Sequence, residues 1–444
     1  MRKIVIVGAN HAGTAGANTI LDNYPGTRVV LFDGNSNISY LGCGTALWIG
    51  RQIDNPAQLF YASKEHFIAK KGEVHLETRV EKIDFRAKRV FARTQEGREI
   101  SEDYDKLILA TGSIPIRPKI PGLDLEGVLS VKLFQDGQKM DQILEDPAVK
   151  NVAVIGAGYI GVELAEAVQR RGKQVLLFEA ADTALSTYYD EEFTHSMDEV
   201  LKKAGIHLHF REKVQGLTGE GRVSGVQTDK GLYPAEAVIT AIGFRPDSAL
   251  GAGEAATLPN GAYRVNRRQE TTVPDVYAIG DCASVYSNAL EDFGYIALAT
   301  NAVRSGLIAG HNAAGGSMES PGVQGSNGIC IFGYKMVSTG LNLRAAERAG
   351  FSPAHTDYED LQKPAFIKEN NGPVKIRLVY DSRTRRLLGA QMASYQDISL
   401  GIHLFSLAIE EKVTIDKLKL LDLFFLPHFN QPYNYITMAA LGAK

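Results

Sequence analysis

The pattern of apolar positions near the N-terminus predicts a strand, a helix and a second strand in succession. Residues 3–7 form a short apolar run that ends in the glycine turn GANHAG, residues 8–13. A helical pattern then continues to about Asn23, and a second apolar run, residues 28–32, ends in Asp33. Short apolar runs separated by a glycine turn and a helical pattern are typical of a βαβ unit.

The same pattern returns near residue 150. The apolar run 152–155 ends in the turn GAGYIG, residues 156–161, and a helical pattern runs to about Arg171. The next apolar run, residues 174–178, ends in Glu179. Two copies of strand, glycine turn, helix, strand and terminal acid predict two dinucleotide-binding units.

Each residue type in these turns has a physical reason. The first glycine, Gly8 or Gly156, permits a tight turn, and the last, Gly13 or Gly161, lets the helix pack closely on the strands. The free amides and positive dipole of the helix N-terminus attract a pyrophosphate. Glycine turns also occur in α/β proteins that bind no cofactor, but the terminal acid of each copy favours nucleotide binding.

The two copies differ at the middle glycine. The second copy has Gly158 and matches GxGxxG completely, whereas Asn10 occupies this position in the first copy and weakens that match. Asp33 and Glu179 lie about 20 residues beyond their turns, where a carboxylate can accept hydrogen bonds from ribose hydroxyls. A carboxylate there repels the 2′-phosphate of NADP, and neither Ala180 nor Ala181 supplies a positive charge. The second unit is therefore expected to bind NADH.

Each unit also ends in a similar way. The apolar run 107–110 leads into TGSIP, and the run 238–241 leads into IGFRP. Apolar strands that run into a glycine turn and a proline predict crossings between domains. A further segment, TVPDVYAIGD (272–281), predicts a strand that presents Asp281 at its end.

The pattern changes from about residue 321. Residues 366–368, 374–380 and 387–393 alternate as antiparallel strands do, with a turn at 381–383, and a helical pattern covers 402–411. The apolar segment LLDLFFLPHF follows. This aromatic surface would be unfavourable on a monomer and predicts a subunit contact, although the same side chains could form an ordinary core.

Composition bounds the class of protein. The 444 residues are too many for one core, and the net charge of -3 gives no reason to expect nucleic acid or an anionic membrane as partner. No apolar run reaches the roughly 18 to 20 residues of a membrane span, and the apolar N-terminal run is better explained as a strand than as a signal peptide. We expect a soluble, cytoplasmic protein. Its three cysteines, Cys43, Cys282 and Cys330, have no CxxC spacing, and no two histidines have metal-ligand spacing.

The two glycine motifs, the ATG segment (110–112) and the PDVYAIGD segment (274–281) together resemble the FAD-dependent pyridine-nucleotide disulfide reductase superfamily. The resemblance covers essentially the whole chain. It implies an α/β fold with two Rossmann-like dinucleotide-binding domains, for FAD and NAD, and a C-terminal α+β dimerisation domain. The implied boundaries are 1–118 and 246–320 for the FAD domain, 119–245 for the NAD domain and 321–444 for the dimerisation domain. A homodimer or a higher oligomer is expected.

The candidate nucleophile is Cys43 in the segment NSNISYLGCG. Disulfide reductases of the superfamily carry a CxxxxC pair, but Trp48 stands where the second cysteine would be. The lone cysteine and the GANHAG turn are therefore similar to the single-cysteine branch, which comprises NADH oxidases, NADH peroxidases and coenzyme A disulfide reductases. Among these the chain most resembles the water-forming oxidases. The resemblance implies that Cys43 cycles between thiolate and sulfenic acid beside the flavin.

A physical argument for Cys43 is independent of the resemblance. Gly42 and Gly44 flank it, and an apolar, helix-like segment follows. A thiolate at a helix N-terminus has a lowered pKa and attacks peroxide readily, stopping reversibly at the sulfenic acid. A purely packing role suits Cys282 or Cys330 better.

His11 lies in the first turn of the predicted FAD helix. The resemblance places it near the flavin and the cysteine as an acid-base group, and its pKa would suit proton transfer near neutral pH. It could instead cap the helix or fill space. His428 is expected at the dimer contact rather than in catalysis.

The resemblance further implies the set of cofactor contacts. For FAD these are Gly8, Asn10, His11, Ala12, Gly13, Asp33, Cys43, Val80, Ala110, Ser113, Lys132, Tyr159, Asp281, Ala297, Leu298 and Ala299. For NADH they are Gly156, Gly158, Ile160, Gly161, Glu179, Tyr188, Gly243 and Gly328. Expected substrates are NADH and dioxygen, with NADH peroxidase, coenzyme A disulfide reductase and a redox sensor with negligible turnover as alternatives.

Overall fold

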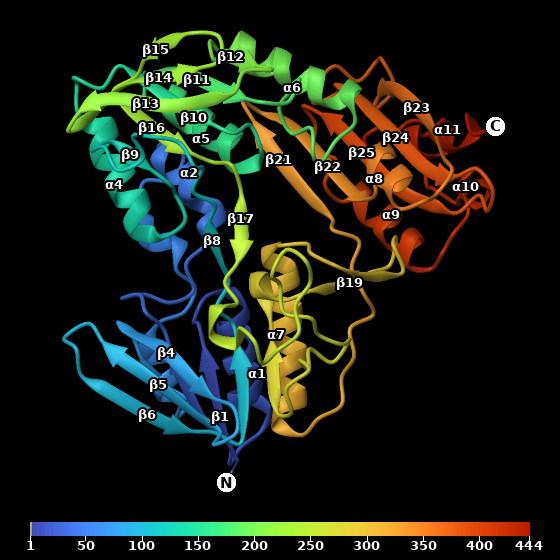
Figure 1. The fold of residues 1–444 in the computed structure, drawn as a ribbon. Helices are drawn as coiled ribbons and strands as arrows, with labels where there is room; N and C mark the ends of the chain where they lie inside the picture. Colours follow the sequence, from blue (N-terminus) through green and yellow to red (C-terminus); the bar gives the residue numbers. More distant parts are fainter. Residues whose placement is uncertain (1) are drawn as a thin grey trace.

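The first parallel sheet of the computed structural model, which describes residues 2–444, is built from distant parts of the chain (Figure 1). Its order is β18 (Val276–Ala278), β7 (Lys106–Leu109), β1 (Lys3–Val7), β2 (Arg28–Phe32) and β3 (Glu73–His75), with every neighbouring pair parallel. All but the first residue of β1 and of β2 are buried, as expected for a sheet covered on both faces. The predicted strands 3–7 and 28–32 are confirmed.

Two helices from opposite ends of this unit pack against each other beside the sheet. They are α1 (His11–Asn23) and α7 (Ala299–Ala314) (Figure 1). Because β18 and α7 follow the second glycine motif in the sequence, the chain leaves the first unit, forms another and returns to complete the first.

The second parallel sheet repeats the plan of the first. Its order is β12 (His207–Phe210), β11 (Gln174–Glu179), β10 (Asn151–Ile155), β16 (Ala237–Thr240) and β9 (Val128–Leu129). Three helices accompany it: α4 (Phe134–Glu145), α5 (Tyr159–Arg170) and α6 (Glu191–Lys203). The predicted second βαβ unit is therefore confirmed.

Two antiparallel segments connect the two units. The strand β8 (Ser113–Pro115) leaves the first unit and pairs with β17 (Phe244–Pro246), which returns to it (Figure 1). These are the two glycine-proline segments in which the sequence predicts crossings, so that prediction is confirmed.

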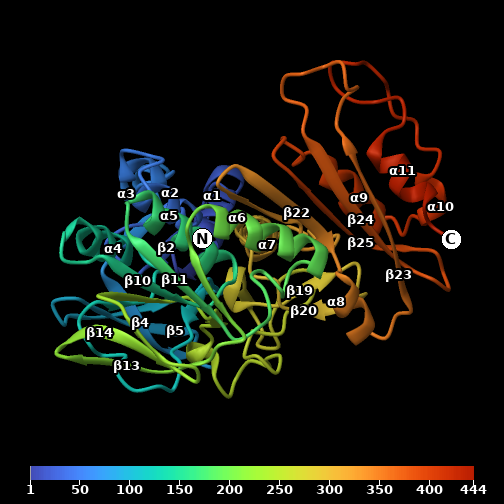
Figure 2. The same ribbon diagram turned by 90° about the horizontal axis from the view of Figure 1, so that it is seen from above.

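The C-terminal domain is a five-stranded antiparallel sheet that stands to one side of the two parallel units (Figure 2). Its order is β21 (Asn327–Ile331), β22 (Tyr334–Gly340), β25 (Leu387–Ser394), β24 (Pro373–Asp381) and β23 (Pro353–Leu361). The helices of this domain are α8 (Leu343–Arg348), α9 (Gly401–Glu410), α10 (Ile415–Leu418) and α11 (Tyr435–Leu441). The predicted strands 374–380 and 387–393 and the predicted helix are confirmed to within one residue at most positions.

The predicted strand at 366–368 is wrong. This segment forms a turn and irregular structure between β23 and β24. The Asn371 side-chain amide donates to the carbonyls of Lys363, Pro364 and Ile367, so the segment closes on itself instead of joining a ladder.

Smaller elements complete the fold. They are the 3-10 turn Gly42–Gly44, α2 (Thr45–Ile49), α3 (Lys64–Ala69), β4 (Thr78–Asp84), β5 (Arg89–Thr94), β6 (Glu99–Asp103), β13 (Val214–Glu220), β14 (Arg222–Thr228), β15 (Leu232–Pro234), β19 (Val285–Ser287) and β20 (Asp292–Gly294). Nowhere in residues 2–444 is there a helix with the length and apolar character needed to cross a membrane.

One hydrophobic core joins parts of the chain that are far apart in the sequence. It contains the core of the second parallel unit, Ala46 and Ile49 of α2, and Ile329 and Ile331 of β21. The segment that follows Cys43 is therefore packed against the second unit and the C-terminal domain at once.

Candidate functional site

The glycine turns of the two parallel units have the same geometry. Gly8 and Gly156 have φ angles of +107° and +101°, which only glycine adopts readily. A Cβ at Gly13 would lie 1.8 Å from the carbonyl oxygen of Gly8, and one at Gly161 would lie 1.9 Å from that of Gly156. Both pairs therefore need glycine for the turn and for close approach of the helix, as predicted.

The terminal acid of each unit holds its own glycine turn. The Asp33 carboxylate accepts hydrogen bonds from the backbone N–H of Ala9 and of Asn35, both at 2.7 Å. Glu179 accepts from the N–H of Ala157 at 2.8 Å and of Ala181 at 2.9 Å. A carboxylate has about four lone-pair sites, so each retains acceptor capacity for a ribose hydroxyl. The sequence predicts only the ribose contact and misses this bracing of the turn.

Burial makes the first of these carboxylates costly to ionise. Desolvation raises the pKa of Asp33, and the hydrogen bonds from Asn35 and Ala9 oppose that rise. The N–H donors therefore favour the charged form that a ribose-binding carboxylate needs.

The structure fits nucleotide pyrophosphates at both helix N-termini. A Cβ at Gly158 would meet no atom within 4 Å, so the backbone there is open to a close ligand. Neither Asn10 nor Gly158, the N-cap residues of α1 and α5, caps its helix with a side chain, and the first-turn N–H groups remain available to an anion.

Polar side chains for a flavin nucleotide gather where the first unit meets the crossing strand β8. Ser113 donates to Asp281 at 2.9 Å, and Lys132 Nζ donates to Ser113 at 2.8 Å and lies 3.6 Å from Asp281. The donors, a hydroxyl and an ammonium, and the carboxylate acceptor match the hydroxyl groups of a ribityl chain and the phosphate that follows it in a flavin nucleotide. This donor set fits FAD.

Cys43 lies in the 3-10 turn that precedes α2 and is exposed to a cavity. The cavity has a volume of about 320 Å³, and its lining includes Glu163 of α5 and Gly328 and Cys330 of β21. A small molecule such as peroxide therefore has a route to the sulfur.

The prediction that the pKa of Cys43 is lowered is wrong, because the protein groups around the sulfur raise it. Protein surrounding the sulfur on its other sides raises the pKa by desolvation, and the negative charge of Glu163 raises it further. The helix that follows Cys43 has only five residues, so its dipole is too small to reverse these two effects. The nearby charge of Lys132 lowers the pKa, but by less.

Glu163 is a candidate site residue that the sequence analysis missed, because it lines the Cys43 cavity. Burial, with the nearby charge of Glu166, raises its pKa to about 7. It lies four residues after Tyr159 on α5, so both side chains project from the same helical face. That spacing was the available signal.

His11 begins α1 and makes a specific contact. Its Nδ1 shares a 2.9 Å hydrogen bond with the hydroxyl of Tyr61, and the two rings are stacked with centroids 5.7 Å apart. The pKa of His11 is lowered from its usual value, chiefly by desolvation and also by the charge of Lys132, although the charge of Asp281 raises it. The imidazole is thus neutral at pH 7, and Asp281 and Lys132 act on both His11 and Cys43.

The tyrosines of the second unit form a cluster with the C-terminal domain. The Tyr159 hydroxyl lies 2.7 Å from that of Tyr189 and donates to the Asn327 side chain of β21. The Tyr159 and Tyr188 rings meet edge to face at 4.5 Å. This cluster fixes the start of α5 against β21, next to Gly328.

The remaining predicted contacts occupy different environments. Leu298 is the N-cap of α7, with Ala297 before it and Ala299 after it, and Gly243 and Gly328 are exposed. Ala12 is buried, whereas Ala110 and Ile160 are half-buried. Val80 differs from these, because its side chain is buried in the core beneath β4 and only its backbone is left for a ligand.

The two other cysteines differ from each other. Cys282 is buried in the core, as predicted. Cys330 is exposed and lines the Cys43 cavity, so its predicted packing role is wrong. The reason is strand alternation: Ile329 and Ile331 point into the core, and Cys330 between them points away.

Comparison with known proteins decides the family. The model described as pyridine nucleotide-disulphide oxidoreductase matches residues 2–306, and that of the dimerisation domain of the same family matches residues 327–434. The chain belongs to this oxidoreductase family. It therefore carries the FAD and pyridine-nucleotide folds of the family and its dimerisation domain.

Full-length relatives of the family support a finer comparison. An NADH oxidase of Lactococcus lactis subsp. cremoris is 57% identical over 445 residues and covers 100% of both chains. An NADH oxidase of Streptococcus pyogenes is 55% identical, again over 100% of both chains. The structure of a water-forming NADH oxidase from Lactobacillus brevis bound to NADH has a TM-score of 0.96 and 35% identity, covering 99% of this chain and 98% of that one.

Two glycines of the second turn should have different roles, one in stability and one in nucleotide binding. Gly161→Ala places a Cβ against the Gly156 carbonyl, and we expect it to lower the midpoint of thermal unfolding by roughly 5 °C. Gly158 has a φ of −74° and open space around it, so Gly158→Ala should fold normally but weaken pyridine-nucleotide binding. Thermal unfolding and nucleotide titration of both variants would check this, and equal unfolding midpoints would contradict it.

We expect the charge of Glu163 to control the pKa of the Cys43 thiol. Above pH 7 its carboxylate is ionised and disfavours a second negative charge on the nearby sulfur, so Glu163→Gln should lower the pKa of Cys43. The rate of Cys43 alkylation against pH, read by peptide mass spectrometry of the holoenzyme, measures this. Glu199→Gln removes the same charge from the exposed face of α6 and should leave the profile unchanged. Identical profiles for Glu163→Gln and the unmodified protein would refute the coupling.

Proposed function

We propose that this chain is an NADH oxidase that reduces dioxygen to water, with FAD as its cofactor and Cys43 as the peroxide-reducing group. The observation that carries the proposal is the exposed sulfur of Cys43 in a cavity that is also lined by Gly328, a proposed NADH contact. The full-length NADH oxidase relatives support the same activity.

The residues divide into two nucleotide sites. The turn Gly8–Gly13, Asp33, the Ser113–Lys132–Asp281 cluster and the start of α7 would hold FAD. The turn Gly156–Gly161, Glu179, Tyr188, Gly243 and Gly328 would hold NADH. FAD, when bound, supplies electron transfer between NADH and dioxygen.

Cys43 completes the reduction. Its thiolate attacks one oxygen of hydrogen peroxide and breaks the O–O bond, which gives Cys43 sulfenic acid and hydroxide. A second NADH then supplies the two electrons that convert the sulfenic acid to thiolate and water. The peroxide comes from the first NADH, whose two electrons, with one proton, reduce dioxygen to hydrogen peroxide at the flavin site; a further proton converts the hydroxide to water. Together the three steps consume two NADH, one dioxygen and two protons and give two NAD+ and two water molecules.

Two side chains manage protons around this sulfur. His11, neutral at pH 7, accepts hydrogen bonds or a proton and is oriented by Tyr61. Glu163, with a pKa of about 7, is protonated in a substantial fraction of molecules near neutral pH and can then donate a proton within the Cys43 cavity.

The C-terminal domain forms the homodimer contact in this proposal. Its segment 420–433 exposes a row of large apolar side chains: Leu420, Phe424, Phe425, Leu426, Phe429 and Tyr433. An uncovered patch of this kind on a domain of the dimerisation family fits a partner subunit. The boundaries 118, 245 and 320 between the domains belong to the same proposal.

Oxygen stoichiometry tests the activity. Purified FAD-loaded protein should consume two NADH per dioxygen and release almost no free peroxide. Peroxide-dependent NADH loss without oxygen uptake would select NADH peroxidase instead. Activity only with coenzyme A disulfide would select the reductase, and no turnover with any of these substrates would select the sensor.

A further inference from the structure

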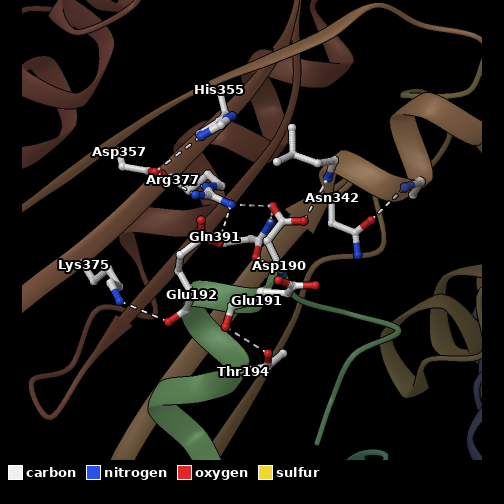
Figure 3. Close-up of polar contacts among 12 residues, drawn as sticks. Asp190, Glu191, Glu192, Thr194, Asn342, His355, Asp357, Lys375, Arg377 and Gln391 are labelled. Atoms are coloured by element: carbon white, nitrogen blue, oxygen red, sulfur yellow. Dashed lines mark hydrogen bonds and ion pairs between the residues drawn. The ribbon is translucent and has the colours of Figure 1, made fainter. Parts of the chain in front are cut away.

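Arg377 of β24 is 1% exposed and is surrounded by carboxylates from two domains (Figure 3). Its Nε and Nη2 donate to the two oxygens of Asp357 on β23 at 2.6 and 2.7 Å. Its Nη1 donates to Glu192 at 2.7 Å and lies 3.4 Å from Asp190. Glu192 lies in α6 of the second parallel unit and Asp190 is its N-cap, so one buried guanidinium joins that unit to the C-terminal sheet.

Arg377 remains positively charged in this buried position. Burial disfavours its charged form, but the hydrogen bonds to Asp357 and Glu192 outweigh that cost and raise its pKa. The same guanidinium lowers the pKa of Glu192 through its hydrogen bond. The ion pair between Arg377 and Glu192 therefore stays charged near neutral pH.

The side chain of Asp190 does not cap the helix that it precedes. It occupies the N-cap of α6, where an aspartate ordinarily accepts from the first-turn N–H groups, yet its side chain makes no capping bond. Its carboxylate instead accepts from Gln391 Nε2 at 2.7 Å and from the N–H of Leu343 at 3.1 Å, and its own N–H donates to Gln391 at 2.8 Å (Figure 3). Both partners lie in the C-terminal domain.

The segment that Asp190 anchors is the one that carries the tyrosine cluster. Asn342 Nδ2 donates to the carbonyl of Thr187 at 3.3 Å, which adds a second anchor. Tyr188 and Tyr189 lie between these two anchor points and contact Tyr159 through a ring contact and a 2.7 Å hydrogen bond. The tether to the C-terminal domain is thus next to the proposed nicotinamide-nucleotide contacts.

We propose that Arg377 is a positioning residue for NADH: through Asp190 and Glu192 it holds segment 187–190 against the C-terminal domain and so sets the NADH affinity. This inference rests on the proposed function, because it assumes that NADH binds the second unit. Arg377 touches no reacting atom. Its loss should therefore change the dissociation constant for NADH more than the limiting rate of reduction.

The test uses Arg377→Met in FAD-loaded protein. Anaerobic mixing with a series of NADH concentrations gives the dissociation constant and the limiting rate, and NAD+ calorimetry gives a second affinity that is independent of turnover. We expect the dissociation constant to rise about tenfold, with the limiting rate changed by less than about twofold. Arg377→Lys keeps the charge but not the bidentate hydrogen bonds to Asp357. It should therefore bind NADH more tightly than Arg377→Met but less tightly than the unmodified protein.

Two further variants keep the test decisive. Glu192→Gln alters a half-exposed partner and should raise the dissociation constant about two- to threefold even if Arg377→Met does not fold. Arg385→Met removes an ion pair with Asp416 that lies wholly within the C-terminal domain and should leave the NADH affinity unchanged. An unchanged NADH affinity in folded Arg377→Met or Glu192→Gln, or an equal loss in Arg385→Met, would overturn the inference. Failure of the unmodified protein to be reduced by NADH would instead overturn the proposed function.

Discussion

The variant Cys43→Ser should still oxidise NADH but release hydrogen peroxide in place of water. Serine fills the same space without a thiolate, so dioxygen reduction stops at the two-electron product. We expect the NADH consumed per dioxygen to fall from two to one, with close to one peroxide formed per NADH. An oxygen electrode, together with a peroxidase-coupled dye assay, measures both quantities.

Cys330→Ser is the matched control for this experiment. Cys330 is exposed in the same cavity, so it tests whether any thiol there suffices. The control should still make water. A Cys43→Ser enzyme that also made only water would remove Cys43 from the mechanism.

Glu179→Ala should raise the KM for NADH by roughly 30-fold. The change removes the carboxylate that would accept hydrogen bonds from the NADH ribose, together with the two backbone hydrogen bonds through which it braces the second glycine turn. A hydrogen bond to a charged acceptor contributes about 1.5–3 kcal/mol. Because part of that loss is recovered by water, a net cost of about 2 kcal/mol is expected, which corresponds to the stated factor. Steady-state kinetics at saturating dioxygen measures the change, while the FAD content should stay normal.

The first unit supplies the counterpart of this prediction. Asp33→Ala removes the equivalent bonds to Ala9 and Asn35. It should lower the FAD content of the purified protein and leave the NADH site intact. If Glu179→Ala lost FAD and Asp33→Ala kept it, the assignment of the two units would be reversed.

The sequence predicted the parallel sheets well because their signals are local. Apolar runs such as 3–7 and 28–32 begin and end at the predicted residues, since a glycine turn and an acid delimit them. The strand predicted at 366–368 failed because the side chain of Asn371 closes that segment locally. No pattern of apolar residues encodes such a closure.

Long-range electrostatics explains most of what the sequence did not reveal at the site. The pKa of Cys43 depends on Glu163, which lies 120 positions away in the chain and is brought close only by the packing of α2 on α5. Arg377 is likewise unremarkable in sequence, and its role becomes visible only when α6 meets the C-terminal sheet. The turn-bracing bonds of Asp33 and Glu179 follow from a βαβ unit but need coordinates to be seen.

The central claim is that peroxide oxidises one particular sulfur. The most direct test uses holoenzyme whose cysteines are reduced and whose FAD is oxidised, with no NADH present. It is treated with one equivalent of hydrogen peroxide in the presence of dimedone, then digested and analysed by mass spectrometry. The account predicts one adduct, on the peptide that contains Cys43, and none on those that contain Cys282 or Cys330. An adduct on Cys330, or none on any cysteine although the peroxide is consumed, would contradict it.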